Sequence, residues 1–575
     1  MPLLTTLSAA LALNTRTPEI TRIELERTLR FLCQPAWEGR LTLAPGERKT
    51  AEFLIEELKQ IGLKPGNGSS YIHEFDITVN QRPTANNALR LRLADGREVR
   101  LELGKDFTPV VGTKPMSLVS APIVFVGYGL NQEGWNDYDK VNVKDKFVLA
   151  FRGVPQGKPN VTNGAKAQWA KQAGARGILF IGPVAEGRQE LPVPTRGQGI
   201  PTGLELVVAG LHRDWFDDLT GMSYVQARAM AAPASQELKA EARLVTEMEP
   251  NRGRGLNVIG ILPGNDPKLR EEVIVIGAHY DHLGFGEVGS RTGNELIHPG
   301  ADDNATGVAG VLALAEHFKM TGSNRRTMVF QLYSGEEVGL VGAAAWVRDN
   351  ANWIQRTSAM INMDMIGRLR DENLTAFCTS SSTEWDAILD GIKVQGVRIN
   401  KVPAVASNSD HAPFARAQVP VVFFHTGLTP EYHTENDTIE TINFDGMLRV
   451  LDVARQTIEA VDRRDTRMSW NPQASFGQRG GQARRVRVGF MPDMGNTTGP
   501  GVLLQGTTPG SPAEKAGLKA GDRVLQIGTR EIKSMDDLQA ALAEARPGQK
   551  LTVIVLRGQE RMTVEITPEA SPAGN

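Results

Sequence analysis

Ionisable residues follow directly on several short apolar segments of this chain. The β-branched run Val273 to Ile276 leads to His279, the run TMVFQLY leads to Glu336 and Glu337, and SAMINMD ends at Asp364. Short apolar runs bounded by turn residues are typical of strands that are buried on both faces of a parallel sheet. Such sheets bind ligands beyond the carboxyl ends of their strands, so the pattern indicates a functional site.

Carboxylates and imidazoles are the side chains that a hydrolytic two-metal site requires. Zinc binds histidine nitrogens and carboxylate oxygens, and two ions roughly 3.5–4 Å apart can hold a hydroxide and polarise a carbonyl together. One further carboxylate must stay off the metals to carry the proton. The sequence offers six candidates, scattered along the chain: His279, Asp302, Glu336, Glu337, Asp364 and His433.

Each candidate has an ordinary structural explanation when it is taken alone. A single His or Asp at a strand end more often caps a helix or satisfies a buried polar group than binds a metal. Glu336 and Glu337 suit a helix N-terminus, where the dipole favours negative charge. Asp302 and Asp303 suit an N-cap beside an acidic first turn. The occurrence of all six candidates in one chain favours the metal site.

Six motifs carry a resemblance to a known family. AHYDHLG, HPGADDNATG, YSGEEVGLVG, INMDMIG, SDHAPF and YHTENDT follow one another in that order. The series resembles the co-catalytic zinc exopeptidases of peptidase family M28 type, the group of bacterial aminopeptidase S, glutamate carboxypeptidase and the inactive transferrin receptor. The resemblance implies an α/β fold: a mixed, mostly parallel sheet flanked by helices, with the phosphorylase/hydrolase-like zinc exopeptidase core.

The resemblance also implies a metal centre with two Zn²⁺ ions per chain. His279 and Asp364 would bind one ion, and Glu337 and His433 would bind the other. Asp302 would bridge the two ions. All of these assignments are carried over residue by residue from the matching motifs.

Three further residues would serve catalysis by the same resemblance. Glu336 would be the general base that takes a proton from the metal-bridging water and passes it to the leaving amine. Asp281 would orient the imidazole of His279, as metal-bound histidines require. Tyr432 stands where some members place a phenol that donates to the developing oxyanion. His282 and the triplet at 409–411 lie within matching motifs but receive no ligand role.

Other catalytic classes lack sequence support. The segment GFGEVG (284–289) fits the G-x-G-x-x-G fingerprint of dinucleotide-binding folds, but SRTGNELIHPG follows it and indicates a loop where that fingerprint requires a helix. The sequence contains no H-E-x-x-H, G-x-S-x-G or Walker sequence, so thermolysin-type, serine-hydrolase and NTPase functions are not indicated.

Composition narrows the class of protein further. The chain has 575 residues with 64 Lys and Arg against 66 Asp and Glu, a net charge of -2 that gives no electrostatic case for nucleic acid. No apolar stretch approaches the roughly 20 residues that span a bilayer. Cys33 and Cys378 cannot form a disulfide framework.

The start, MPLLTTLSAALALNTRTPE, has a short apolar stretch without a basic n-region, and we expect export to the periplasm or medium, with a cytoplasmic location as the alternative.

Changes in pattern along the chain predict four parts. A discontinuous peptidase domain is expected at 20–100 and 250–463, interrupted at 105–245 by an insert that resembles a β-rich protease-associated domain. The Gly-, Gln- and Arg-rich segment 464–485 is expected to be a linker. Residues 486–570 contain SPAEKAGLKAGDRVLQIG and resemble a PDZ domain. Its loop near Val488–Phe490 only partly matches the carboxylate-binding loop of that family, so capture of a peptide or C-terminus and a purely structural role both stay open.

The sequence therefore predicts a zinc-dependent exopeptidase that acts on peptides or proteins. An aminopeptidase that removes N-terminal residues is the favoured activity. Two alternatives remain: a carboxypeptidase of the glutamate carboxypeptidase type, for which no cluster of basic side chains is found, and an inactive peptide-binding scaffold, against which the intact set of six residues argues.

Overall fold

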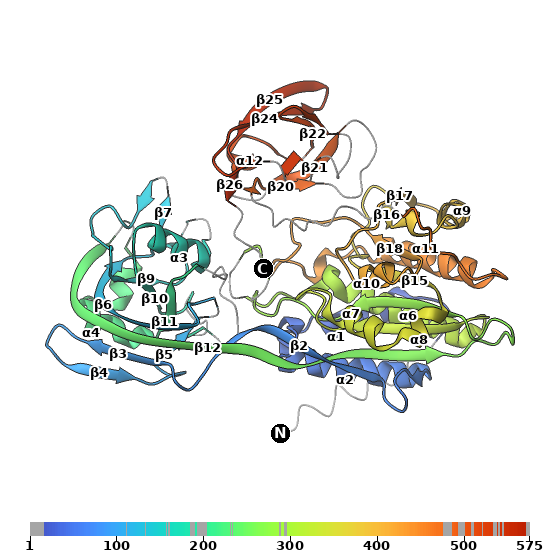
Figure 1. Ribbon diagram of the computed structural model, residues 1–575, viewed down its shortest axis with the longest axis horizontal. Coiled ribbons are helices and arrows are strands. Elements are labelled where there is room, and N and C mark those ends of the chain that lie inside the picture. The colour runs from blue at the N-terminus through green and yellow to red at the C-terminus, as the bar shows by residue number, and fades with distance from the viewer. Residues whose placement is uncertain are drawn as a thin grey trace.

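The computed structural model of the chain describes residues 17–570, with gaps at 111, 133, 157, 159–160, 185–189, 193–203, 231, 233, 287–288, 293–295, 475–485, 493–500, 508–510, 520, 533–537, 539–540 and 543–544. Figure 1 shows three bodies of secondary structure, of which the right-hand one contains the strands that end at the candidate residues. The predicted export segment falls largely on residues 1–16, which lie outside the described residues. None of the helices that the described residues form is both long and apolar enough to cross a bilayer.

Four parallel strands form the centre of the right-hand body. Their order is β18, β15, β13, β14, with β12 antiparallel to β14 on one side and β16 antiparallel to β18 on the other. Pairing of β17 with β16, and of β1 and β2 with β12, extends the sheet. The strand bounds are β13 (Val273–His279), β14 (Thr327–Tyr333), β15 (Thr357–Met363), β18 (Val421–His425), β12 (Ser235–Leu262), β16 (Asn373–Phe377), β17 (Arg398–Val402), β1 (Lys64–Pro65) and β2 (Ile72–Pro83).

Helices cover both faces of this sheet because its strands are apolar on both faces. Ile274 and Ile276 of β13 belong to one hydrophobic cluster and Val273 and Val275 to another, as the alternation of side chains along a strand requires. The first cluster is covered by α1 (Arg22–Leu32), α2 (Pro45–Ile61), α6 (Gly307–Thr321), α9 (Trp385–Gly391) and α11 (Phe444–Asp462), the second by α7 (Val341–Asp349), α8 (Ala351–Arg356) and α10 (His411–Arg416). The predicted mixed, mostly parallel sheet flanked by helices is confirmed.

A single long strand joins this body to the left-hand one. This strand, β12, runs unbroken over 28 residues and pairs with β6 before it reaches β14. The left-hand body has its own hydrophobic clusters, which support the predicted insert, although its boundaries stay a prediction. Its elements are β3 (Ala88–Arg92), β4 (Glu98–Leu101), β5 (Phe107–Pro109), β6 (Met116–Val126), β7 (Asn131–Gln132), β8 (Trp135–Asn136), β9 (Phe147–Phe151), α3 (Asn163–Gln172), β10 (Gly177–Ile181), β11 (Val207–Leu211), α4 (Phe216–Thr220) and α5 (Tyr224–Arg228).

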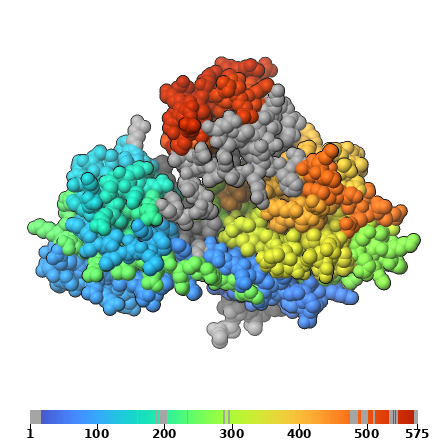
Figure 2. Space-filling view, viewed as in Figure 1, coloured from blue at the N-terminus to red at the C-terminus, as the bar shows by residue number. Residues whose placement is uncertain are grey.

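The C-terminal residues form a small antiparallel sheet around a hydrophobic cluster of their own. Figure 2 shows them as a separate lobe at the top of the view. The elements are β19 (Val486–Arg487), β20 (Phe490–Pro492), β21 (Val502–Thr507), α12 (Pro512–Lys515), β22 (Asp522–Ile527), β23 (Arg530–Glu531), β24 (Leu551–Arg557), β25 (Glu560–Ile566) and β26 (Glu569–Ala570).

The segment predicted as a linker begins as an ordered extension of the peptidase body. Met468 is buried in the cluster beneath α11, and its backbone N–H donates to Oγ of Ser358 at 3.1 Å. Asn471 donates its backbone N–H to the carbonyl of Ser381 at 2.9 Å. The remainder of the predicted linker, 475–485, lies outside the described residues.

Candidate metal centre and active site

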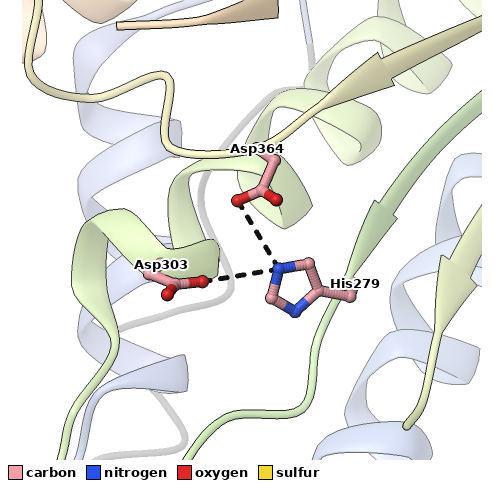
Figure 3. A group of neighbouring side chains, drawn as sticks. All are labelled: His279, Asp303 and Asp364. Atoms are coloured by element: carbon pink, nitrogen blue, oxygen red, sulfur yellow. Dashed lines mark ion pairs between the residues drawn. The ribbon is translucent and has the colours of Figure 1, made fainter. Parts of the chain in front are cut away.

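The candidate residues converge at the carboxyl ends of the parallel strands. His279 is the last residue of β13, Asp364 follows β15, and Glu336 and Glu337 lie in the loop after β14. Figure 3 shows Asp303, at the entry to α6, and Asp364 pointing toward the ring of His279. This is the edge at which a parallel α/β sheet binds its ligands, so the arrangement expected from the strand ends is present.

One group of carboxylates surrounds Nε2 of His279. Oδ1 of Asp303 lies 3.4 Å from this nitrogen, Oδ1 of Asp364 lies 3.5 Å away, and Oε2 of Glu336 lies 3.9 Å away. The imidazole is 1% exposed. Oδ1 of Asp364 is buried and has no hydrogen-bond partner among the described residues. Buried acceptors that face an imidazole nitrogen without hydrogen bonds among themselves are arranged as ligands of a cation.

A second group of carboxylates surrounds Nε2 of His433. Oδ2 of Asp303 lies 3.1 Å from this nitrogen and Oε2 of Glu337 lies 3.3 Å from it. Glu337 also contacts a third imidazole, because its Oε1 lies 2.7 Å from Nδ1 of His282. Asp303 is therefore the residue whose two oxygens face the two histidines, one oxygen to each.

The position predicted for Asp302 is occupied by its neighbour Asp303. Asp302 was predicted to be the carboxylate shared between His279 and His433. This prediction is wrong by one residue, because Asp303 faces both histidines. Asp303 has non-helical dihedrals, φ -105° and ψ 93°, so the backbone turns its side chain into the crevice. The sequence contains no signal for this choice, because two adjacent aspartates at the start of a helix are alike in type and in distance from every other motif.

Asp302 instead holds the loop that follows β15. Its Oδ1 accepts the backbone N–H of Gly367 at 2.8 Å and the hydroxyl of Thr306 at 3.3 Å. Its own backbone N–H donates to the carboxylate of Asp437 at 3.0 Å, and the backbone N–H of Asp303 does the same. Asp437 lies in the YHTENDT motif, and its support of the aspartate pair was not predicted.

Hydrogen bonds to the main chain fix which nitrogen of each histidine faces the carboxylates. Nδ1 of His279 lies 3.2 Å from the carbonyl of Asp281, and Nδ1 of His433 lies 3.0 Å from the carbonyl of Gly289. A carbonyl accepts only, so in the neutral imidazoles both Nδ1 atoms carry the proton and both Nε2 atoms present a lone pair. Lone pairs and carboxylates that face one another fit a borderline cation such as zinc, which binds both donor types.

Without ions, the carboxylates hold protons on the two histidines. Burial opposes the charged form of His279, but the surrounding carboxylates, Glu336 first, raise its pKa well above the usual value. The pKa of His433 is raised in the same way by Glu337 and Asp303, against the effect of burial. Burial and the charge of Glu337 raise the pKa of Asp303 to about 7. A divalent ion would replace these protons, since metal ligands must be deprotonated.

Glu336 faces His279 from a greater distance than Asp303 and Asp364 do. Its contact with His279 is the longest of the three around that nitrogen, and it belongs to neither tight cluster of possible ligand atoms among the described residues. Burial raises the pKa of Glu336 well above the usual value, with the charge of His279 acting in the opposite direction. A carboxylate beside a group of possible metal ligands, with a raised proton affinity, suits the role of general base.

Asp281 organises the loop of Glu336 as well as the ring of His279. The imidazole of His279 contacts the backbone carbonyl of Asp281 more closely than its carboxylate, at 3.2 Å against 3.8 Å. The carboxylate accepts the backbone N–H groups of Glu336 and Glu337 at 3.1 and 3.4 Å and the hydroxyl of Thr42 at 2.8 Å. Its predicted link to His279 thus runs mainly through the main chain.

Tyr432 lies against the ring of His433. The two rings are stacked with centroids 3.8 Å apart and an angle of 25° between their planes. Burial, together with the charges of the site carboxylates, raises the pKa of Tyr432 well above the usual value, so the phenol keeps its proton. A protonated phenol beside the site is able to donate a hydrogen bond to an oxyanion.

Two further residues support the site but are not candidate metal ligands themselves. Ser409, in the SDHAPF motif, donates its hydroxyl to Oδ2 of Asp364 at 2.8 Å and so directs Oδ1 toward His279. Arg40, in the WEGR sequence, is buried and donates to four backbone carbonyls, including those of Tyr280 and Gly300 on either side of the site. The SDHAPF motif was predicted to belong to the site, but no residue pattern indicated the contacts of Ser409 and Arg40.

Comparison with known families identifies two parts of the chain. Residues 257–458 match Peptidase family M28, and residues 482–567 match the PDZ domain. The first match contains every candidate residue from His279 to His433. The second covers the antiparallel C-terminal sheet, so both resemblances read from the motifs are confirmed.

Individual relatives are aminopeptidases. Aminopeptidase YwaD of Bacillus subtilis (strain 168) is 22% identical over 74% of this chain and 82% of its own length. Leucine aminopeptidase 1 of Trichophyton equinum is 27% identical over 33% of this chain, which spans only 54% of that relative. Among solved structures, BSAP, a zinc aminopeptidase from Bacillus subtilis, is 20% identical with a TM-score of 0.48, over 80% of this chain and 100% of that one. The protein described here contains a peptidase domain of family M28 followed by a PDZ domain.

Proposed function

We propose that this protein is a zinc-dependent aminopeptidase whose centre holds two ions. The single observation that carries the proposal is the carboxylate of Asp303, which presents Oδ1 to His279 and Oδ2 to His433. A carboxylate shared in this way is what a two-metal hydrolase requires of its bridging residue. The names of the curated relatives, YwaD and the leucine aminopeptidases, support the choice of aminopeptidase over carboxypeptidase.

The distances between candidate ligand atoms support the ion-binding role. Two ligands of a tetrahedral zinc ion, each bonded at about 2.0–2.1 Å, lie about 3.3 Å apart. The four contacts of Nε2 of His279 and His433 with Asp303, Asp364 and Glu337 measure 3.4, 3.5, 3.1 and 3.3 Å. One ion would be held by His279, Asp364 and Asp303, and the other by His433, Glu337 and Asp303. The buried negative charge of these carboxylates needs compensation, which two divalent cations would supply.

The residues around the ions divide the work of peptide hydrolysis. Bound zinc supplies Lewis acidity, which lowers the pKa of water and polarises the scissile carbonyl. Glu336 accepts the proton of the attacking water and delivers it to the nitrogen of the leaving amine. The phenol of Tyr432 donates to the oxygen of the carbonyl as negative charge develops on it. Asp281 keeps the loop of Glu336 in place for both proton transfers.

A comparison of substrates tests the activity. The purified full-length protein should release the N-terminal residue from leucine p-nitroanilide and from dipeptides with a free amine, and N-acetylated dipeptides should resist it. Treatment with a chelator should abolish the activity and added zinc should restore it. Cleavage of the N-acetylated dipeptides at their C-terminal residue would support the carboxypeptidase alternative. Zinc binding without cleavage of any peptide would support the inactive scaffold.

We further propose that the PDZ domain binds an extended peptide segment. Within the described part of that domain, β20 is one of the two end strands of its sheet and pairs only with β21. A free strand edge beside a loop with Gly489 at φ +87° suits the addition of a peptide strand. Fluorescence anisotropy of labelled peptides with free and amidated C-termini, measured on the full chain, tests this proposal. A saturable signal that is lost on amidation is expected, and no binding of any peptide would favour a structural role.

A further inference from the structure

Glu337 stands between two imidazoles that approach it at different distances. Nε2 of His433 is 3.3 Å from Oε2, whereas Nδ1 of His282 is 2.7 Å from Oε1. Two ligands of one tetrahedral zinc ion lie about 3.3 Å apart when each bond is about 2.0–2.1 Å long. The contact of His433 has this separation, while the contact of His282 has the length of an N–H···O hydrogen bond.

The chemistry of the pair fixes the proton of His282. A carboxylate only accepts hydrogen bonds, so Nδ1 of His282 must carry a proton that points at Oε1 of Glu337. This nitrogen lies 4.0 Å from Oδ2 of Asp303, well beyond the separation of the other candidate ligand pairs. The opposite nitrogen, Nε2, is buried without a hydrogen-bond partner in the described part of the chain. His282 therefore faces the cluster with a donor, whereas the neutral imidazoles of His279 and His433 face it with lone pairs.

The ring of His282 is held in this orientation by close backbone contacts. Its backbone N–H donates to the carbonyl of Arg40 at 3.1 Å. Gly300 packs directly on the ring, since a Cβ at that position would lie 2.4 Å from Cδ2 of His282. The ring of His433 stands edge-on to it with centroids 5.9 Å apart. Rotation of the imidazole away from Glu337 is blocked on these sides.

We propose that His282 is a positioning residue for the metal centre. Its Nδ1–H holds Oε1 of Glu337, so that Oε2 is the oxygen presented beside His433. The inference rests on the proposed two-ion function, because it assigns the orientation of one ligand of the second ion. Residues that hydrogen-bond to metal ligands typically change metal affinity 10–100-fold when they are lost.

Two variants of nearly equal size isolate the donor. His282→Asn retains an N–H donor at the position of Nδ1, whereas His282→Leu removes it and leaves the volume similar. Zinc affinity is measured on the full chain by competition with a chromophoric chelator, which resolves two binding steps. We expect His282→Leu to weaken one step by about 10–100-fold and His282→Asn to restore most of that loss. The weakened step should be the one that disappears in His433→Ala, and the other step should be unchanged.

Other results would overturn the inference. Equal zinc affinity in His282→Leu and the unmodified protein would show that the donor does not position Glu337. Equal losses in the Asn and Leu variants would indicate that the imidazole packs or binds the ion directly. Cobalt-substituted protein provides a second measurement. Loss of a direct ligand changes the visible absorption of the bound ion, whereas loss of a positioning residue leaves its coordination number intact. If the unmodified protein binds no second ion, the proposed two-ion function fails. Two unchanged zinc-binding steps in His282→Leu would instead leave that function intact and overturn only the role of His282.

Discussion

The carboxylate of Asp281 accepts the backbone N–H of Glu336 at 3.1 Å, and this bond ties the loop after β13 to the loop after β14. The bond explains how two residues from separate strand ends keep a fixed separation. Asp281 is fully buried, and burial raises its pKa while the charge of His279 lowers it. A buried acceptor with several donors is costly to remove, because each donor then loses its partner.

Replacement of Asp281 by Ala should therefore disturb ion binding and catalysis together. The backbone N–H of Glu336 and the hydroxyl of Thr42 would lose their acceptor. We expect zinc affinity to fall by about 10–100-fold and kcat to fall with it. Thr42→Val serves as the matched control, since it removes a single donor to the same carboxylate and should leave zinc affinity near its starting value. Unchanged zinc affinity in Asp281→Ala would contradict this account of the loop.

Asp302 and Asp303 should behave differently although they are adjacent and identical in type. Asp303→Asn removes charge from the carboxylate that faces both histidines, so zinc content should fall from two ions per chain toward none. Asp302→Asn keeps an oxygen that accepts the N–H of Gly367, so the zinc content should be retained. Elemental analysis after gel filtration measures both. The opposite pattern, with zinc lost in Asp302→Asn and kept in Asp303→Asn, would restore the assignment first read from the sequence.

Glu336→Gln should separate catalysis from ion binding. Gln cannot accept the proton of water, so kcat on leucine p-nitroanilide should fall by at least about 10²–10⁴-fold. The zinc content should stay the same, because Glu336 belongs to neither tight cluster of possible ligand atoms among the described residues. Substantial residual activity in this variant would remove Glu336 from the role of general base.

The thermal stabilisation by zinc should grow as the pH rises. In the ion-free protein the pKa values of His279 and His433 lie above 6.5, so their contribution to stability is complete below about pH 6.5 and is lost as the pH rises through the folded-state values. Zinc competes with these protons and binds better as they leave. Scanning calorimetry should show a larger zinc-dependent rise in Tm at pH 8 than at pH 5.5. An equal or smaller rise at pH 8 would contradict the competition between zinc and the protons of the two histidines.

The general location of the site was predictable from the sequence because strand ends in parallel sheets are ligand sites. The positions of His279, Glu336 and Asp364 follow from apolar runs that end in ionisable residues. His433 is different: it lies in a loop with φ +57°, and it does not directly follow an apolar run. Periodicity carries no information about such a residue, because its position depends on contacts between distant loops.

Finer features depend on backbone geometry that the residue pattern does not encode. The choice between Asp302 and Asp303 rests on dihedrals at the entry to α6, and the role of His282 rests on the close approach of Gly300. The predicted boundary between the insert, 105–245, and the second peptidase segment, 250–463, falls within the single strand β12. In the structure this strand pairs first with β6 and then with β14, so one strand belongs to both bodies.

Anomalous diffraction from crystals of the zinc-loaded protein, collected at the zinc absorption edge, tests the central claim most directly. The account predicts two anomalous peaks, one beside Oδ1 of Asp303 and Nε2 of His279, the other beside Oδ2 of Asp303 and Nε2 of His433. A single peak, or a peak bound by the carboxylate of Asp302 in place of Asp303, would contradict it.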